Sequence, residues 1–144
     1  MNQDFKNCID KKKLYKSYNA KGLVKKEFGS ATDDLEDAKL SFSKKRYKWA
    51  TIQAYYAMFH AARALLYSRG YRERSHYCVL VGIEQLFGEE RHIDMKWVRA
   101  FKNAMSLRED ADYADEYSKE GAEIAINNAQ SFLKEAERIL KGSK

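Results

Sequence analysis

The stretch YKWATIQAYYAMFHAARALLYSRG, residues 47–70, decides the fold. Its apolar side chains recur every three or four residues, which is the period of one helix face. They are Trp49, Ile52, Tyr55, Phe59, Ala62 and Leu66. Gly70 suits the left-handed position that ends a helix. The stretch therefore predicts one long helix with an apolar stripe.

The rest of the chain repeats this helical pattern. We expect a helix from about residue 20 to 44, a short one begun by Ser75 and closed by Gly88, one capped by Asp94, and a last one over about 118–141. The chain contains no proline, the residue that interrupts helices because it lacks a backbone N–H. The sequence predicts an all-α, up-and-down antiparallel bundle of about five helices, without a sheet. The large side chains expected in its core are Trp49, Phe59, Leu66, Trp97, Phe101 and Phe132.

The positive charge is concentrated at the start of the chain. The formal net charge is +6, and residues 1–28 hold eight lysines against three carboxylates. We expect residues 1–19 to form a frayed or weakly helical basic extension ahead of a bundle over 20–144. Such an arm could contact nucleic acid through counterion release, or it could only keep the protein in solution.

The cysteines and the hydropathy pattern indicate in which cellular compartment the protein works. Cys8 and Cys78 stand far apart and in no metal-ligand spacing, so we expect two reduced thiols in an intracellular protein. No signal peptide opens the chain, and no apolar run approaches the length of a membrane span. The prediction is a cytoplasmic protein without membrane contact.

The sequence shows no familiar metal or cofactor motif. The three histidines do not fall at i, i+4, and neither phosphate-binding glycine pattern is present. We therefore expect no metal and no cofactor. A polar stripe of Tyr56, His60, Arg63 and Tyr67 accompanies the apolar one along residues 47–68. It indicates a polar cleft or dimer seam, or only half-exposed side chains with paired tips.

Arg108 falls on the apolar side of its helix. A buried charge needs a partner of opposite sign, because an unpaired one is very costly. Asp110, Asp112 or Asp115 could supply it internally. A phosphate could supply it externally, since guanidinium binds phosphate through two parallel hydrogen bonds.

Three segments resemble the HEPN superfamily, and most of all its small free-standing members from archaea and bacteria. They are AYYAMFHAARALL (54–66), GYRERSHYCV (70–79) and LREDADY (107–113), and the similarity covers roughly residues 20–140. The resemblance implies an up-and-down bundle that forms a homodimer. It also implies a minimal nucleotidyltransferase as partner, because many members are metal-independent RNases that act as the toxin of such a pair.

The nuclease motif of the family is an arginine and a histidine separated by four to six residues. Arg69 and His76 fit that spacing by chance, since they lie between two helices, whereas the position of the motif in the family points to Arg108. Tyr113 stands where its histidine should be, and a phenol, with a pKa of about 10, is a poor base at neutral pH.

The resemblance also implies a set of site residues. We expect Arg108, Tyr113 and His76 at the reacting phosphate, with Arg72, Arg74, His60 and Arg63 as further ligand-binding side chains. The function expected is binding of a nucleotide or of an RNA phosphate in concert with the nucleotidyltransferase. Two alternatives stay open: an active RNase with a histidine recruited from elsewhere in the chain, and a structural or assembly protein.

Overall fold

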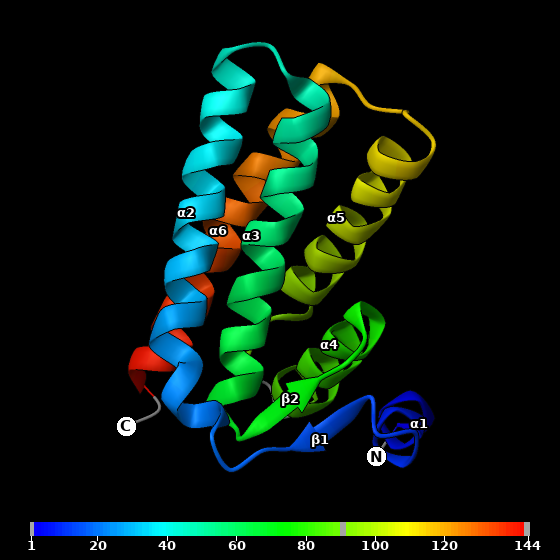
Figure 1. Cartoon of the computed structure of the whole chain (residues 1–144), viewed down its shortest axis with the longest axis vertical. Coiled ribbons are helices and arrows are strands. Elements are labelled where there is room, and N and C mark those ends of the chain that lie inside the picture. Colours follow the sequence, from blue (N-terminus) through cyan, green and yellow to red (C-terminus); the bar gives the residue numbers. More distant parts are fainter. Residues whose placement is uncertain (1, 90–91, 143–144) are drawn as a thin grey trace.

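The computed structural model describes residues 2–89 and 92–142. In chain order its elements are α1 (Gln3–Asp10), β1 (Leu14–Lys16), the 3₁₀ turn η1 (Ala20–Leu23), α2 (Val24–Ser43), α3 (Tyr47–Ser68), β2 (Tyr71–Glu73), α4 (His76–Ile83), the π-helical segment η2 (Glu84–Gly88), α5 (Met95–Tyr113) and α6 (Lys119–Gly142). Successive long helices run in opposite directions, so the all-α bundle predicted from the sequence is confirmed (Figure 1).

Helix α3 is the centre of the bundle. It contacts α2, α6, α5 and α4, and fourteen of its side chains are buried. Many of these are alanines, which let neighbouring helices approach closely. Phe59 and Leu66 on α3, Phe101 on α5 and Phe132 on α6 are buried as predicted.

The two tryptophans are less buried than predicted. Trp49 is half exposed, and Trp97 is only partly buried. Trp49 lies seven residues before Tyr56, so it belongs to the polar stripe of α3 and not to the apolar one. The expectation of a buried Trp49 is therefore wrong, because one helix position was assigned to the wrong face.

The predicted helix ends are found where the cap residues stand. The side chains of Ser75 and Asp94 accept hydrogen bonds from the amides of Cys78 and Lys96, at the starts of α4 and α5. Gly70 follows α3 with a φ of 80°, a conformation that glycine adopts without strain. Gly70 and Ser75 therefore bound the loop that leads from α3 into α4, and Asp94 begins α5.

The expectation of a chain without any sheet is wrong at one place. Strands β1 and β2 pair antiparallel, with Leu14 opposite Glu73, Tyr15 opposite Arg72 and Lys16 opposite Tyr71. Each strand has only three residues, too few to show the two-residue alternation by which a strand is detected in a sequence.

The N-terminal extension is folded onto the bundle: of the two states expected, frayed or weakly helical, it is helical over α1 and not frayed. Phe5 and Cys8 of α1 and Leu14 of β1 are buried. The amide of Asn2 donates to Oε1 of Gln85 at 2.9 Å. Residues 2–16 therefore form a fixed layer below the bundle (Figure 1).

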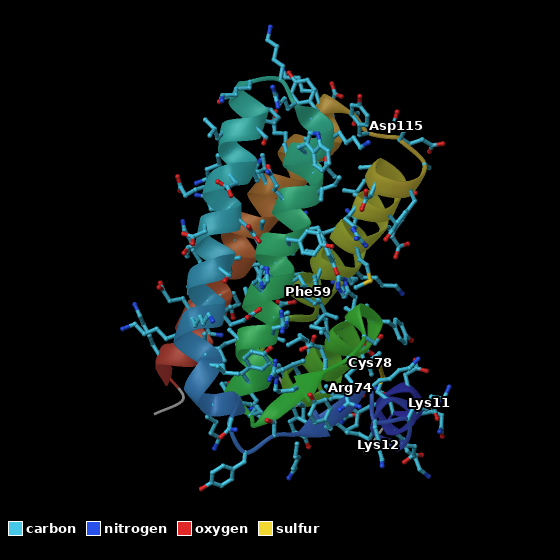
Figure 2. All side chains as sticks on the ribbon, in the orientation of Figure 1. Lys11, Lys12, Phe59, Arg74, Cys78 and Asp115 are labelled. Atoms are coloured by element: carbon cyan, nitrogen blue, oxygen red, sulfur yellow. A yellow bond between two sulfur atoms is a disulfide. The ribbon has the colours of Figure 1, made fainter. Side chains whose placement is uncertain are left out.

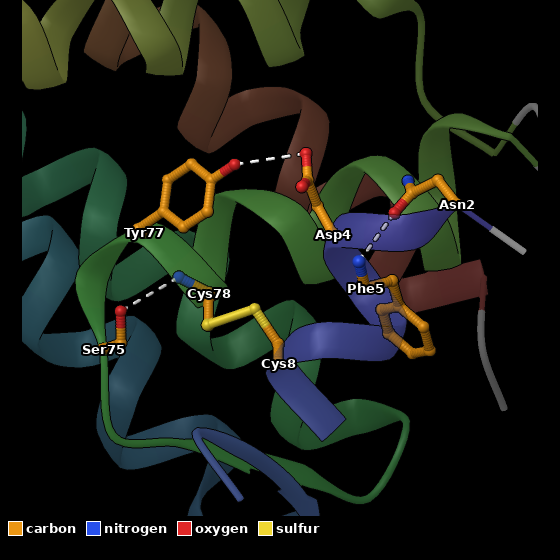
Figure 3. The surroundings of a disulfide bond; sticks show 7 residues. All are labelled: Asn2, Asp4, Phe5, Cys8, Ser75, Tyr77 and Cys78. Atoms are coloured by element: carbon orange, nitrogen blue, oxygen red, sulfur yellow. Dashed lines mark hydrogen bonds between the residues drawn. A yellow bond between two sulfur atoms is a disulfide. The ribbon is translucent and has the colours of Figure 1, made fainter. Parts of the chain in front are cut away.

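A disulfide joins Cys8 of α1 to Cys78 of α4, with 5.9 Å between their Cα atoms (Figure 3). The expectation of two reduced thiols is therefore wrong. The two cysteines are 70 residues apart in the sequence, and only the packing of α1 against α4 brings them together. Beside them the hydroxyl of Tyr77 donates to the carboxylate of Asp4 at 3.2 Å.

Within residues 2–89 and 92–142, no helix combines the length and the apolar character needed to cross a bilayer.

Candidate functional site

Arg108 occupies the side of α5 that faces α3. Its side chain is only 14% exposed. It donates from Nη2 to the hydroxyl of Tyr56 at 2.9 Å, and the same nitrogen lies 3.4 Å from a carboxylate oxygen of Asp112. The guanidinium also lies over the rings of Tyr55, Tyr56 and Tyr113, at 5.7, 5.4 and 5.2 Å from their centroids. Aromatic faces attract a cation, so these rings hold the guanidinium in place.

The hydrogen-bonding capacity of Arg108 is only partly used. The internal partner among the three aspartates considered above is Asp112, which is itself 35% exposed. In the described residues, the buried Nε–H of Arg108 has no acceptor. A guanidinium carries five N–H donors, and a buried donor without an acceptor is unfavourable. The arrangement therefore leaves one buried guanidinium donor of Arg108 without an acceptor among the described residues.

His76 is the first residue of α4 and lies beside the same tyrosines. Its Nδ1 is 2.9 Å from the hydroxyl of Tyr55, and its ring stacks on Phe59 with 4.1 Å between centroids. Tyr55 is fully buried, which raises the pKa of its phenol. The phenol therefore stays protonated and orients the imidazole. His76 and Arg108 thus share Tyr55 and Tyr56 as their common support.

The charge state of His76 follows from its surroundings. Burial lowers its pKa, and the positive charges of Arg108 and Arg63 lower it further, with a smaller contribution from His60. A histidine whose pKa lies below the ordinary value is neutral at pH 7. Neutral imidazole is the form that can take up a proton.

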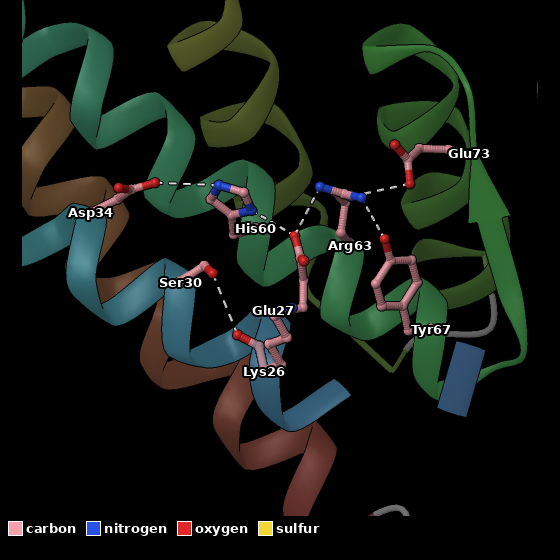
Figure 4. Close-up of polar contacts among 8 residues, drawn as sticks. All are labelled: Lys26, Glu27, Ser30, Asp34, His60, Arg63, Tyr67 and Glu73. Carbon is pink, nitrogen blue, oxygen red and sulfur yellow. Dashed lines mark hydrogen bonds and ion pairs between the residues drawn. The ribbon is translucent and has the colours of Figure 1, made fainter. Parts of the chain in front are cut away.

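Arg63 on α3 has a different environment (Figure 4). Its Nε lies 3.1 Å from Glu73, its Nη1 3.1 Å from Glu27, and its Nη2 donates to the hydroxyl of Tyr67 at 2.5 Å. The coulombic effect of the two carboxylates raises its pKa although burial opposes this. Each of its three nitrogens therefore already has a partner.

His60 is enclosed by carboxylates in the same way. Its Nδ1 is 2.5 Å from Glu27, and its Nε2 is 3.3 Å from Asp34 (Figure 4). Burial raises the pKa of Asp34, while the nearby His60 lowers it. Both ring nitrogens therefore lie next to a carboxylate oxygen. We call the side chains of Glu27, Asp34, His60, Arg63, Tyr67 and Glu73 the α2–α3 network.

The two arginines of the 72–76 loop do not share the support of Arg108. The guanidinium of Arg72 lies over the ring of Tyr67 at 5.4 Å, and its buried Nε has no acceptor among the described residues. Arg74 is exposed and lies over Tyr15 of β1 at 4.8 Å. Of this loop, the structure brings only His76 to the rings that surround Arg108.

Tyr113 is the last residue of α5 and is 75% exposed. Its ring covers the guanidinium of Arg108, so it lies beside the candidate site. Tyr55 and Phe59 were assigned to the core alone, and their contact with His76 was missed. A tyrosine on an apolar stripe is the signal, because a buried phenol needs a hydrogen-bond partner.

Comparisons with known proteins show the family of the chain. A family model described as the HEPN domain matches residues 24–139. A protein from Methanocaldococcus jannaschii that is named a putative toxin is 34% identical over 112 residues, which cover 77% of this chain and 84% of that protein. A UPF0332 protein from Archaeoglobus fulgidus is 32% identical over 108 residues, 74% of this chain and 86% of its own. A UPF0332 protein from Thermotoga maritima is 27% identical over 116 residues, 79% and 88% of the two chains. The chain belongs to the HEPN family.

Proposed function

We propose that this protein binds the phosphate of a nucleotide or of RNA between Arg108 and His76, and that it acts with a minimal nucleotidyltransferase in a toxin–antitoxin-like pair. The observation that carries the proposal is the incomplete pairing of Arg108. Its guanidinium is largely buried, yet in the described part of the chain its Nε–H lacks an acceptor, and the carboxylate of Asp112 beside it is a third exposed. A phosphate oxygen is the acceptor that would complete it.

The relatives support the toxin part of the proposal. Two Methanocaldococcus jannaschii proteins, 34% and 26% identical to this chain, are named putative toxins. A toxin of this kind needs an antitoxin, and the HEPN resemblance makes a minimal nucleotidyltransferase the partner that we propose. The same resemblance leads us to propose a homodimer.

Binding of inorganic phosphate and of AMP, measured by isothermal titration calorimetry, tests the site. We expect Arg108→Ala to weaken binding by about tenfold or more, since hydrogen bonds to charged groups contribute about 1.5–3 kcal/mol. Arg99→Ala is the matched control, because Arg99 is an exposed arginine on the same helix. Equal affinities of the two variants would favour the structural alternative, in which Arg108 serves only its internal pair with Asp112.

The position of His76 favours a second function, metal-independent RNA cleavage. Its neutral imidazole could accept the proton of a ribose 2′-hydroxyl, while Arg108 stabilises the negative charge that develops on the phosphate. The histidine that the family places five residues after Arg108 would then be supplied from the start of α4. Tyr113, which stands at that position in this chain, would then take no part in the proton transfer.

Cleavage of a labelled RNA in the presence of EDTA separates the two functions. An active RNase predicts that His76→Ala lowers the rate by about 10²–10⁴-fold, the usual contribution of a general base, while RNA binding persists. Tyr113→Phe is the control, since it keeps the ring over Arg108 and removes only the phenol. Binding without any cleavage by the unchanged protein would leave the binding function alone.

A further inference from the structure

The N-terminal segment carries a dense positive charge in a fixed position. Its exposed cations are Lys6, Lys11, Lys12, Lys13 and Lys16, and Arg74 of the facing loop joins them across the strand pair. The carboxylates of this segment are Asp4, which accepts from Tyr77, and Asp10. We call the surface formed by α1, β1, β2 and Arg74 the basic ribbon surface (Figure 2).

Three connections hold this surface in place. The Cys8–Cys78 disulfide joins α1 to α4 (Figure 3). Strand β1 pairs with β2, and the amide of Arg74 donates to the carbonyl of Lys13 at 2.8 Å just beyond the paired residues. The amide of Asn2 is bonded to Gln85. The backbone that carries these lysines is therefore fixed to the rest of the fold. The connections offset the electrostatic repulsion between the lysine side chains.

An aromatic hollow of about 520 Å³ lies within the same surface. Its apolar lining comes from Phe5, Ile9, Leu14, Tyr15 and Tyr71, and Lys6, Lys16 and Asp10 complete it. Lys16 lies over the ring of Tyr71 at 5.8 Å and Arg74 over the ring of Tyr15 at 4.8 Å. A flat base with a phosphate on either side fits aromatic rings flanked by cations.

The basic ribbon surface lies next to the candidate site along the chain. Arg74 precedes His76 by two residues, or about 7 Å of extended chain. A strand of nucleic acid lying along β1 and the loop would therefore reach the imidazole. The lysines themselves all precede residues 24–139, where the HEPN model matches, so the inference does not depend on that match.

We infer that the basic ribbon surface binds the backbone of single-stranded RNA and leads it to His76 and Arg108. The inference rests on the proposed function for the direction of the strand, and on the charge and the aromatic hollow for the binding itself. RNA is favoured over a membrane because the aromatic side chains line a recess, whereas insertion into a bilayer needs apolar side chains that protrude.

Fluorescence anisotropy with a labelled single-stranded 12-nucleotide RNA tests the inference on the full chain. The variant Lys11→Gln/Lys13→Gln/Lys16→Gln removes three exposed charges from the ribbon. The control Lys39→Gln/Lys44→Gln/Lys134→Gln removes three exposed charges from α2, its C-terminal end and α6. We expect the ribbon variant to bind at least about tenfold more weakly in 0.1 M salt. Its plot of log affinity against log salt should lose about 2 units of slope, since each contact of a single strand contributes about 0.7. The control should change affinity by less than about twofold.

Tyr15→Leu adds a measurement that charge alone would not change. Loss of a stacking ring should lower affinity by about fivefold or more and leave the salt slope unaltered. Thermal melts of all variants would show that the fold is retained. An unchanged salt slope in the folded ribbon variant would overturn the inference. Binding of the unchanged protein to phosphatidylglycerol vesicles but not to the RNA would also overturn it, in favour of a membrane surface.

Binding of inorganic phosphate and AMP distinguishes this inference from the proposed function. The ribbon variant should bind both small ligands like the unchanged protein, because they contact Arg108 and not the lysines. Loss of RNA binding in the ribbon variant, combined with no phosphate binding at Arg108, would support the ribbon and contradict the proposed site.

Discussion

The molecule holds two sets of one arginine and one histidine: Arg63 with His60 on α3, and Arg108 with His76 on α5 and α4. The two sets differ in how many internal hydrogen-bond and ion-pair partners they have. In the α2–α3 network, Arg63 contacts Glu27, Glu73 and Tyr67, and His60 lies between two carboxylates. Around α5, Arg108 has one hydroxyl and one carboxylate within reach, and His76 has one phenol. The residue types are the same, but among the described residues the second pair has fewer internal partners, which is why the proposed ligand is placed there.

The surrounding charges make the same distinction. His60 faces the carboxylates of Glu27 and Asp34. His76 lies in the field of Arg108 and Arg63, which lowers its pKa. The first pair belongs to an internal ion network, and the proposed function assigns the bound anion and the proton transfer to the second. Pairing and local charge, more than residue identity, separate a stabilising cluster from a binding site.

The largest expected effect is on the free energy of unfolding. If Arg63 did not contribute more to it than Arg108, the contrast between the two arginines would be lost. Arg63→Ala leaves the largely buried carboxylate of Glu73 without its cation and leaves Glu27 with His60 alone. Removing one partner of such a pair costs about 3–5 kcal/mol. We expect Arg108→Ala to cost less than about 1.5 kcal/mol, because it removes one hydrogen bond and one partly exposed ion pair. Urea denaturation at pH 7 measures both, and equal losses would mean that Arg108 is as structural as Arg63.

The next prediction concerns the titration of His76 and sharpens the electrostatic side of the comparison. Its folded pKa lies below the ordinary value of about 6.5. Between the two pKa values the unfolded chain binds more protons, so this histidine makes stability rise with pH up to about 6.5. Arg108→Gln should raise the pKa of His76, which NMR of the imidazole protons measures. If the pKa of His76 did not change in this variant, Arg108 and His76 would not be electrostatically coupled and would not form one site.

The smallest effect comes from Asp112, the internal competitor of a ligand at Arg108. Its pair with Arg108 is partly exposed, and such pairs contribute about 0.2–1 kcal/mol. Asp112→Asn should therefore strengthen phosphate binding up to about fivefold and leave stability nearly unchanged. Glu73→Gln, the matched change in the α2–α3 network, should lower stability without improving phosphate binding. Calorimetry and thermal melts on the two variants give the comparison.

The sequence predicted the bundle because periodicity is a local signal. Phe59, Leu66, Phe101 and Phe132 repeat with the helix, and Ser75 and Asp94 have the chemistry of caps, so each could be located from its neighbours. The polar stripe with His60 and Arg63 was also visible. Its partners were not, because Glu27 and Glu73 belong to other elements and are brought to α3 only by packing.

The N-terminal segment could not be predicted for the same reason. Cys8 meets Cys78 across 70 residues, and β1 meets β2 in strands of three residues each. Neither contact leaves a period in the sequence. The candidate site could be predicted only in part. Arg108 was recognisable as a charge on an apolar helix face. That His76 and Arg108 both lie against Tyr55 depends on the packing of α4 and α5 against α3.

The most direct test of the account is the guanidinium of Arg108 itself. NMR of the arginine side-chain Nε–H groups during titration with AMP would observe this buried donor, which lacks an acceptor among the described residues. The account predicts that the Nε–H of Arg108 and the ring of His76 shift with the bound fraction, while Arg63 and His60 stay unchanged. Shifts at Arg63 and His60, with Arg108 unchanged, would contradict it.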